Sequence, residues 1–347
     1  MSENIRVGLI GYGYAGKTFH APLIAGTPGM TLASVVSRDA EKVHTDWPEV
    51  QVVADARQLF DNPDIDLIVI PTPNDTHFPL AKAALQAGKH VVVDKPFTIT
   101  LEQARELDKL AKHCGKLLSV FHNRRWDSDF LTLQALLADG LLGEVAYFES
   151  HFDRYRPVVR DRWREKPAAG GGIWYDLGPH LLDQTIRLFG LPVSIDVDLA
   201  QLRNGAQATD YFHAILAYPQ RRVILHGSVL APAETPRYIV QGTRGGYIKY
   251  GLDPQEDRLK AGERLPQANW GIDSRDGVLT LAKGDALEQH ILPTLPGNYL
   301  AYYEGIRNAL LGKGENPVPA IQAIEVMELI ELGIQSAEQH KAIKLKK

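Results

Sequence analysis

The feature that most constrains the fold is a series of short apolar runs in the first third of the chain. They are rich in Val, Ile and Leu and lie at residues 5–10, 31–36, 66–70, 90–93 and 117–121. Each run is nearly continuous instead of alternating with polar residues, which is typical of strands covered on both faces. Helical patterns separate the runs. This alternation predicts an α/β fold with a doubly wound parallel sheet.

The pattern changes after about residue 123, so we expect two domains, residues 1–123 and residues 124–347. Short alternating segments between 192 and 250 predict an antiparallel sheet with one covered face. The polar residues 251–297, rich in Gly, Pro and Asp, are expected to have little regular structure. Further helices are expected at 100–114 in the first domain and, in the second, near 128–138, 176–188, 299–311 and 319–338.

A glycine-rich turn, Gly11-Tyr12-Gly13-Tyr14-Ala15-Gly16, follows the first apolar run and precedes a helical pattern. In that context G-x-G-x-x-G is typical of dinucleotide-binding folds. Gly11 permits the tight turn, Gly13 lets the backbone approach a pyrophosphate, and Gly16 allows helix and strand to pack closely. We therefore expect these six residues to bind a dinucleotide. The alternative is a tight turn without a ligand.

The end of the second apolar run favours NADP over NAD as that dinucleotide. An NAD-binding fold usually carries an acidic residue roughly 20 residues further on, where it holds the ribose 2′-hydroxyl. Here the chain reads Ser37-Arg38-Asp39. Arg38 can stack on adenine and pair with a 2′-phosphate, and Ser37 can donate a hydrogen bond. Asp39 is acidic, but its position better fits the N-cap of the next helix. The alternative for Arg38 is a solvated surface charge.

Two prolines fix the backbone directly after the run at 66–70, where open α/β sheets bind ligands. Between and beside them, Thr72, Pro73 and Asn74 are expected to contact the ribose and the nicotinamide. His77 comes at the start of the next helix. Two roles stay open for it, a cofactor contact or a histidine held by local hydrogen bonds.

Lys95 follows the run at 90–93 and is held by Pro96, again at the ligand-binding edge. There its ammonium can donate a hydrogen bond to a reacting oxygen and stabilise negative charge on it. The alternative is an ordinary surface lysine.

Asp176 and His180 form the second candidate for proton transfer. On a helix, positions i and i+4 share a face. An Asp/His pair can act as a general base with its orienting group, and imidazole titrates near the working pH. One alternative is a helix cap beside a structural histidine. A second is a pair of metal ligands, but no HExxH or cysteine motif accompanies them, so we expect no metal.

Composition excludes several functional classes. The 38 Lys and Arg residues against 42 Asp and Glu give a net charge of −4, which argues against a nucleic-acid binder with a large basic surface. No stretch approaches the roughly 18 apolar residues of a membrane span, and no signal-peptide pattern opens the chain. The single cysteine, Cys114, fits a reducing compartment. We expect a cytoplasmic protein with no nucleic-acid or membrane partner.

Taken together, these motifs resemble those of the Gfo/Idh/MocA oxidoreductase family. The family commonly has Glu before the lysine, so Asp94 is a departure that leaves Lys95 and Pro96 in place. The specific motifs are GYGYAG at 11–16, TPN-x-x-H at 72–77, DKP at 94–96 and GGG-x-x-x-D-x-G-x-H at 170–180. The segments most similar to the NADP-dependent scyllo-inositol dehydrogenase group lie at 122–130, 152–157 and 161–164.

The resemblance implies a Rossmann domain that binds NAD(P), then an α/β domain with a large, open, mostly antiparallel sheet. That sheet commonly joins subunits, so the resemblance implies a homodimer or homotetramer. It also implies that Lys95, Asp176 and His180 are the catalytic residues. The residues that match segments lining the family's substrate site are Asn123, Arg124, Tyr155 and Trp163; ordinary core packing is the alternative for Trp163.

These observations lead to one main hypothesis for the activity, hydride transfer between a nicotinamide cofactor and a secondary alcohol or ketone of a cyclic polyol or sugar such as scyllo-inositol. His180 would accept the hydroxyl proton, Lys95 would stabilise the alkoxide, and Asp176 would hold the hydroxyl or the imidazole. Two alternatives stay open. One is a tightly bound cofactor that serves an internal redox exchange or redox-assisted glycosidic cleavage, and the other is a non-catalytic nucleotide sensor.

Overall fold

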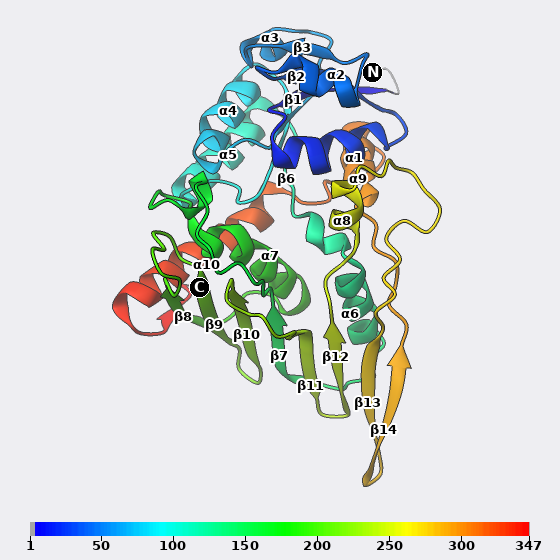
Figure 1. Ribbon diagram of the computed structural model, residues 1–347, viewed down its shortest axis with the longest axis vertical. Helices are drawn as coiled ribbons and strands as arrows, with labels where there is room; N and C mark the ends of the chain where they lie inside the picture. Colours follow the sequence, from blue (N-terminus) through cyan, green and yellow to red (C-terminus); the bar gives the residue numbers. More distant parts are fainter. Residues whose placement is uncertain (1–3, 347) are drawn as a thin grey trace. The chain divides into compact units, whose positions relative to one another are not determined.

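The computed structural model describes residues 4–346 and consists of two compact units (Figure 1). Unit 1 comprises the chain up to Trp126 together with Pro254–Trp270 and Asn298–Ile324. Unit 2 comprises Asp127–Asp253, Gly271–Gly297 and the residues from Glu325 onward. Among the helices of the described chain, none has the length and apolarity that crossing a membrane requires.

Unit 1 is built on a six-stranded sheet in the order β3-β2-β1-β4-β5-β6, in which every neighbouring pair is parallel. This order, reversing between β1 and β4, is that of a Rossmann fold and confirms the predicted doubly wound sheet. The strands run β1 Ile5–Ile10, β2 Met30–Val36, β3 Gln51–Val53, β4 Leu67–Ile70, β5 His90–Val93 and β6 Leu118–Val120. Strand β4 is fully buried, as a continuous apolar run predicts.

Helix α5 (Leu101–Cys114) begins and ends at signals that the sequence carries. It has the capping box of Thr100 and Gln103 at its start and Gly115 in the left-handed conformation at its end. The other helices of unit 1 are η1 Gly16–His20, α1 Ala21–Ala25, α2 Ala40–Asp46, α3 Arg57–Phe60, α4 Asn74–Gln86, η2 Asn123–Trp126, α8 Gln255–Lys260 and α9 Leu300–Leu310. The predicted helix at 100–114 is therefore confirmed.

Helix α9 is encoded late in the chain but completes the core of unit 1. Its Tyr303 hydroxyl lies 2.6 Å from His20 Nδ1, and its Tyr302 hydroxyl lies 2.9 Å from Ser119 Oγ. The ring of Phe121 packs against both tyrosines, edge-on against Tyr302 at a centroid distance of 4.9 Å. All five side chains are buried. Aromatic burial of this kind is a large part of what stabilises a core.

Unit 2 is built on a nine-stranded sheet in the order β14-β13-β12-β11-β7-β10-β9-β8-β15. Only the central pair of β7 and β10 is parallel; the other neighbours are antiparallel, so the expected mostly antiparallel sheet is confirmed. The strands are β7 Val145–His151, β8 Ser194–Ala200, β9 Tyr211–Ala217, β10 Arg222–Ser228, β11 Pro236–Gly242, β12 Gly245–Tyr250, β13 Gly277–Lys283, β14 Ala286–Leu292 and β15 Ile343–Lys344.

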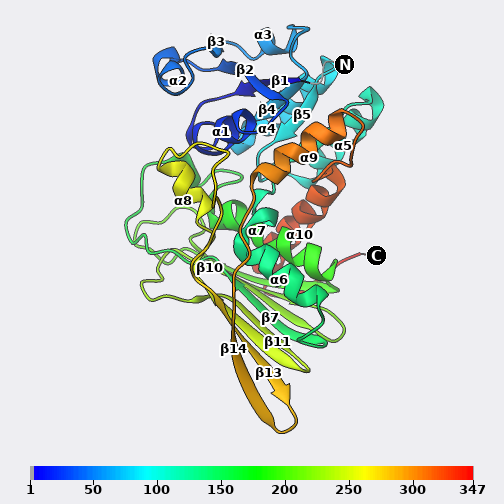
Figure 2. The ribbon, with the colours of Figure 1, turned by 90° about the vertical axis from the view of Figure 1, so that its right-hand side faces the viewer.

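Helices cover one face of this sheet and leave the other without helices (Figures 1 and 2). Side chains alternate between the two faces along β10: Val223 and Leu225 are buried under the helices, and Ile224 and His226 are partly exposed on the opposite face. The covering helices are α6 Ser128–Ala138, α7 Gly172–Phe189 and α10 Ala320–Gln339. A short turn of helix, η3 Trp163–Glu165, precedes α7.

Two sequence expectations for the second half were wrong. The segment 251–297 contains α8 and the hairpin of β13 and β14 (Figure 1). The hairpin was missed because most of β14 is exposed to solvent, so its apolar residues do not mark a covered face; Leu287 and Ile291 are 73% and 68% exposed. Helix α7 starts at Gly172, four residues before the expected 176. Its first turn, GIWY, is partly apolar, and the preceding glycines hid the start.

Candidate active site

The glycine turn joins β1 to the first helix of unit 1 and has the geometry that a bound pyrophosphate requires. Gly11 has a φ of 102°, which favours glycine, and a Cβ on Gly16 would lie 2.3 Å from the Gly11 carbonyl oxygen. A Cβ on Gly13 would meet no atom within 4 Å. Gly11 and Gly16 therefore shape the turn, while Gly13 leaves open space beside its backbone. This is a cradle that a side chain would fill, and it fits a dinucleotide phosphate.

The side chains of the turn are occupied elsewhere, so only its backbone and exposed surface are available to a ligand. Tyr12 is buried and donates a hydrogen bond to Asp46 at 2.8 Å, and burial raises its pKa. Tyr14 is 54% exposed, yet its hydroxyl donates to Glu256 at 2.8 Å, and partial burial with that carboxylate raises its pKa to about 12. Ala15 is half-buried at the start of the helix.

The end of β2 is followed by Ser37, Arg38 and Asp39, which have different surroundings. The Asp39 side chain caps α2 by accepting a hydrogen bond from the Lys42 N–H at 2.9 Å, as predicted. Ser37 is half-buried, and its hydroxyl lies 3.1 Å from both the N–H and the carbonyl oxygen of Asp39. Arg38 is exposed. With Asp39 committed to the cap, the cation at position 38 is the side chain available to an adenosine ribose.

The prolines after β4 lead into α4, whose N-cap residue is the exposed Pro73 and whose first residue is the buried Asn74. Thr72 is half-buried. His77 is buried, and its Nδ1 and Nε2 lie 2.8 and 2.9 Å from the carbonyl oxygens of Pro96 and Thr72. Burial lowers the pKa of this imidazole. Local hydrogen bonds therefore hold His77, and through it the segments of Thr72 and Pro96 are tied together at one sheet edge.

Lys95 leaves β5 with its backbone fixed by its neighbours. Its N–H donates to the Asp94 carboxylate at 2.7 Å, and the other Asp94 oxygen lies 3.8 Å from His20 Nε2. Burial alone would raise the pKa of the Asp94 carboxyl, but His20 and the charge of Lys95 hold it below its usual range. The ammonium-bearing side chain itself is half-buried.

Asn123 and Arg124 begin η2 and are both buried. The Arg124 Nη2 lies 2.6 Å from Glu256 Oε2. Burial would raise the pKa of the Glu256 carboxyl, but Arg124, Tyr14 and Lys260 hold it at about 2. The guanidinium thus anchors α8 within unit 1, and its expected contact with substrate stays a prediction.

In unit 2, α7 presents Asp176 and His180 one turn apart. His180 is 5% exposed and stacks on Phe152 at a centroid distance of 6.4 Å. Gly178 lets the helix close on its packing partners, because a Cβ there would lie only 3.1 Å from Trp174 and 3.2 Å from Ile330. Pro179 lies inside the helix and is also buried. The local sequence therefore fixes the face on which the acid and the imidazole stand.

Two guanidinium groups flank Asp176, and sequence reasoning did not single them out. Arg154 Nη1 lies 3.7 Å from Asp176 Oδ2, and Arg164 Nε lies 3.5 Å from Oδ1. Both arginines belong to the segments at 152–157 and 161–164 that carry the closer family resemblance, which was the available signal. Their positive charges compensate that of the carboxylate.

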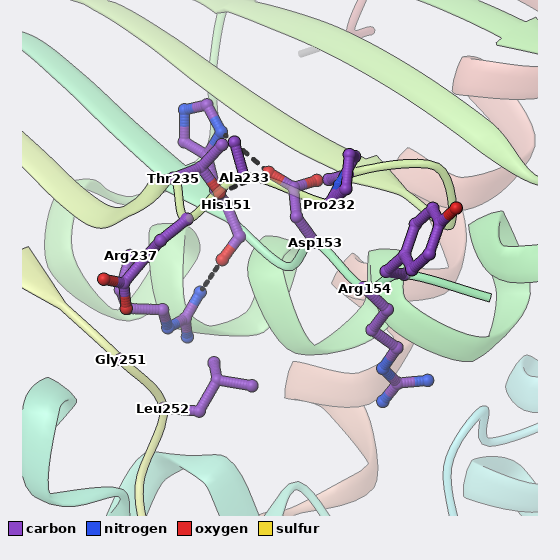
Figure 3. A pocket seen from close by; sticks show the side chains of 12 residues that line it. His151, Asp153, Arg154, Pro232, Ala233, Thr235, Arg237, Gly251 and Leu252 are labelled. Atoms are coloured by element: carbon purple, nitrogen blue, oxygen red, sulfur yellow. Dashed lines mark hydrogen bonds and ion pairs between the residues drawn. The ribbon is translucent and has the colours of Figure 1, made fainter.

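The remaining predicted residues lie in the same segments. Trp163 is half-buried, and the Arg164 guanidinium stacks over its ring at 4.4 Å. Tyr155 is 61% exposed, and its backbone forms a bridge with Leu230. Tyr155 also lines a cavity of about 310 Å³ with Arg154 and Arg237 (Figure 3).

Unit 1 offers groups that can hold a dinucleotide, and unit 2 offers groups that can move a proton. Unit 1 brings the glycine turn, residues 37–38, residues 72–74 and Lys95 to the carboxyl edge of one parallel sheet. Unit 2 brings together Asp176, His180 and the two arginines. A buried imidazole beside a carboxylate is a general acid–base arrangement, and an ammonium group can stabilise an oxyanion.

Comparison with known proteins gives two family models that together cover most of the chain. Residues 5–122 match the oxidoreductase family NAD-binding Rossmann fold, and residues 134–345 match the C-terminal alpha/beta domain of the same Gfo/Idh/MocA family. The NAD-binding description supports a nicotinamide cofactor for unit 1.

Full-length relatives agree with these matches. The chain is 74% identical over 342 residues to the uncharacterized oxidoreductase YdgJ of Escherichia coli K12, covering 99% of both chains. It is 38% identical to the scyllo-inositol 2-dehydrogenase (NADP(+)) IolW of Bacillus subtilis 168, covering 99% of this chain and 96% of IolW. A solved oxidoreductase structure from Yersinia pestis is 67% identical with a TM-score of 0.97, covering 100% of this chain and 99% of that one.

Proposed function

Because the chain belongs to the Gfo/Idh/MocA oxidoreductase family, we propose that it transfers a hydride between NADP and a secondary alcohol or ketone of a cyclic polyol or sugar. The observation that carries this proposal is the pair of the half-buried Asp176 and the buried His180 on α7, in a chain that also carries Lys95 at a dinucleotide-binding edge. Similarity to IolW along nearly the whole chain supports a polyol such as scyllo-inositol as the substrate.

The cofactor half of the proposal rests on unit 1. The backbone of residues 11–16 would hold the pyrophosphate, Ser37 and Arg38 the adenosine ribose and its 2′-phosphate, and Thr72, Pro73 and Asn74 the nicotinamide end. NADP is favoured because Asp39 caps α2 and leaves Arg38 exposed. When bound, the nicotinamide accepts or supplies the hydride.

The residues of this chain would handle the oxygen and its proton. His180 accepts the proton from the substrate hydroxyl in oxidation and returns it in reduction. Lys95 donates a charge-assisted hydrogen bond to the same oxygen as negative charge develops on it. Asp176 orients the imidazole or the hydroxyl, and Arg154 and Arg164 keep its carboxylate in place. No metal is needed for these steps.

The test is an NADPH-absorbance screen over inositols, inososes and pentoses with the wild type, His180→Ala and Lys95→Ala. A general base contributes roughly 10²- to 10⁴-fold. We therefore expect His180→Ala to lower kcat by about that factor with unchanged NADPH affinity, and Lys95→Ala to lower kcat similarly. His113→Ala, on the exposed surface of α5, is the matched control and should behave as wild type.

Unchanged turnover in His180→Ala would refute its role, and a Lys95→Ala defect confined to cofactor affinity would make Lys95 a binding residue. A cofactor that stays on the protein through gel filtration, with no NADPH released during turnover, would replace the proposal by an internal redox reaction. Tight nucleotide binding without turnover of any substrate tested would replace it by a nucleotide sensor.

We also propose that the helix-free face of the sheet in unit 2 joins two copies of the chain. Strand pairing aligns one row of side chains across this face from β14 to β9. Apart from Glu149, the row is apolar and at least partly exposed, and consists of Ile291, Val278, Ile248, Ile239, Ile224 and Ile215. Light scattering would give the mass expected of a homodimer or homotetramer. The single Cys114 supports work in the cytoplasm.

A further inference from the structure

A second row of side chains crosses the helix-free face beside the apolar row and consists largely of histidines. In the parallel register of β7 and β10, His151 is paired with His226, and in the antiparallel register of β10 and β9, His226 is paired with His213. Asp153 follows His151 by two residues. Sequence reasoning missed this cluster because its members come from separate strands and only the pairing unites them.

We propose that His151, Asp153 and His226 form a binding site for a divalent transition metal of the zinc class. Within the described residues 4–346, this is the group of His, Cys, Asp and Glu side chains whose potential ligand atoms all lie within 4.8 Å of one another. Two imidazoles and a carboxylate are a donor set that suits such ions.

Two distances between imidazole nitrogens and the Asp153 carboxylate are close to those of a zinc site, and they run to different oxygens of that carboxylate. His151 Nδ1 lies 3.4 Å from Asp153 Oδ2, and His226 Nε2 lies 3.6 Å from Asp153 Oδ1. Tetrahedral zinc with ligands at about 2.0–2.2 Å places neighbouring ligand atoms about 3.4 Å apart. The His151 Nδ1 atom is covered and makes no hydrogen bond, although its side chain lies among polar groups. A metal would satisfy that nitrogen.

The outer nitrogen of each imidazole faces a polar side chain, and that of His151 faces a carboxylate, a usual partner of metal-binding histidines. His151 Nε2 lies 2.6 Å from the Glu149 carboxylate, so that carboxylate can fix the ring with Nδ1 facing Asp153. His226 Nδ1 lies 3.3 Å from His213 Nδ1.

The carboxylate is held as firmly as the rings. Asp153 Oδ2 accepts a hydrogen bond from the Thr235 hydroxyl at 2.7 Å, and Oδ1 accepts one from the Ser228 N–H at 2.9 Å. Figure 3 shows His151 and Thr235 converging on the Asp153 carboxylate at the wall of the cavity of about 310 Å³. Three protein ligands leave a fourth position of a tetrahedral zinc ion open for water or a small oxygen ligand. The proposed ligands do not include Asp176 or His180, and the proposal does not depend on hydride transfer.

The experiment measures zinc bound to the untagged, full-length protein in the oligomeric state in which it is purified. The protein is dialysed against a chelator, loaded with Zn²⁺, passed through gel filtration and analysed for metal. We expect one zinc per chain, and a chain that emerges without zinc overturns the proposal. Co²⁺, loaded in the same way, should give visible absorption bands that report its ligands and require no substrate.

Variants identify the ligands. His226→Gln should weaken zinc affinity at least 100-fold and abolish the Co²⁺ bands. His290→Gln, a histidine on β14 of the same sheet that lies 4.0 Å from a Glu288 oxygen, is the control and should bind as wild type. Glu149→Gln removes a supporting carboxylate only, so it should weaken affinity by 10- to 100-fold and keep the bands.

Wild-type affinity in His226→Gln would place the metal elsewhere and overturn the site. Circular dichroism and NADPH affinity establish that each variant is folded. If His226→Gln does not fold, His151→Gln replaces it, because His151 is the proposed ligand on strand β7. The expected and the contradicting results are the same.

Discussion

Gly13→Ala is the substitution that best separates ligand binding from folding in unit 1. A Cβ at this position would meet no atom within 4 Å, and its φ lies outside the left-handed region, so the protein without ligand has room for the methyl group. We expect the free energy of unfolding without cofactor to change by less than about 0.5 kcal/mol, or to rise by up to about 1 kcal/mol because alanine narrows the unfolded ensemble.

Cofactor affinity should respond very differently. The methyl group fills the space through which the backbone approaches the pyrophosphate, and the loss of one hydrogen bond to a charged group is worth about 1.5–3 kcal/mol. At 1.4 kcal/mol for each factor of ten, the Kd for NADPH should rise by about 10- to 150-fold. Fluorescence titration with NADPH and thermal unfolding of the protein without cofactor provide the two measurements.

Gly16→Ala is the matched control, three residues away in the same turn. Its Cβ would lie 2.3 Å from the Gly11 carbonyl oxygen, so turn and helix must move apart. Overpacking of this kind costs about 1–3 kcal/mol, and this variant should unfold at lower temperature even without cofactor. If Gly13→Ala binds NADPH as tightly as the wild type, or is itself destabilised like Gly16→Ala, the assignment of a phosphate-binding role to Gly13 is wrong.

Two further predictions follow from unit 1. Arg38→Ala should raise the Kd for NADP by about 10- to 150-fold, since a charge-assisted hydrogen bond is lost, and leave the Kd for NAD unchanged. An equal rise in both Kd values in titrations would refute a role at the 2′-phosphate, and no change in either would make Arg38 a surface charge. His90 Nδ1 accepts the Leu117 N–H at 2.9 Å, and burial, with the charge of Lys116, lowers its pKa to about 4. As the pH falls from about 6.5 to 4, the imidazole of His90 is protonated in the unfolded chain before it is protonated in the folded protein. The stability that the neutral His90 contributes is therefore present above this pH range and is lost within it. In denaturant unfolding, the free energy of unfolding should fall less between pH 7 and 4.5 in His90→Asn than in the wild type. An identical fall in both proteins would show that His90 does not contribute to this pH dependence.

Much of unit 1 follows from local sequence because each of its signals acts over a few residues. The continuous apolar runs predict buried parallel strands, Thr100 and Gln103 predict the start of α5, and Asp39 predicts the cap of α2. The spacing of Asp176 and His180 likewise places them on one face of α7. These features needed no knowledge of distant residues.

The features that could not be predicted from the sequence depend on pairing between distant segments. His151 and His226 come together only through the register of β7 and β10. Glu256 is 132 residues from Arg124 along the chain and reaches it because α8 packs in unit 1. Strand β14 has polar or exposed side chains on both faces, so its sequence lacks the alternation that marks a half-buried strand.

The return of late segments to unit 1 also sets the order in which a newly made chain can mature. Tyr302 and Tyr303 fill the space around Ser119, Phe121 and His20, so this core stays incomplete while the ribosome is still translating the middle of the message. Domains usually fold during synthesis, starting from the N-terminus. Here unit 1 can complete its core only after the residues up to Ile324 have been synthesised. A chain that ended after Trp126 would lack the two tyrosines that fill this core.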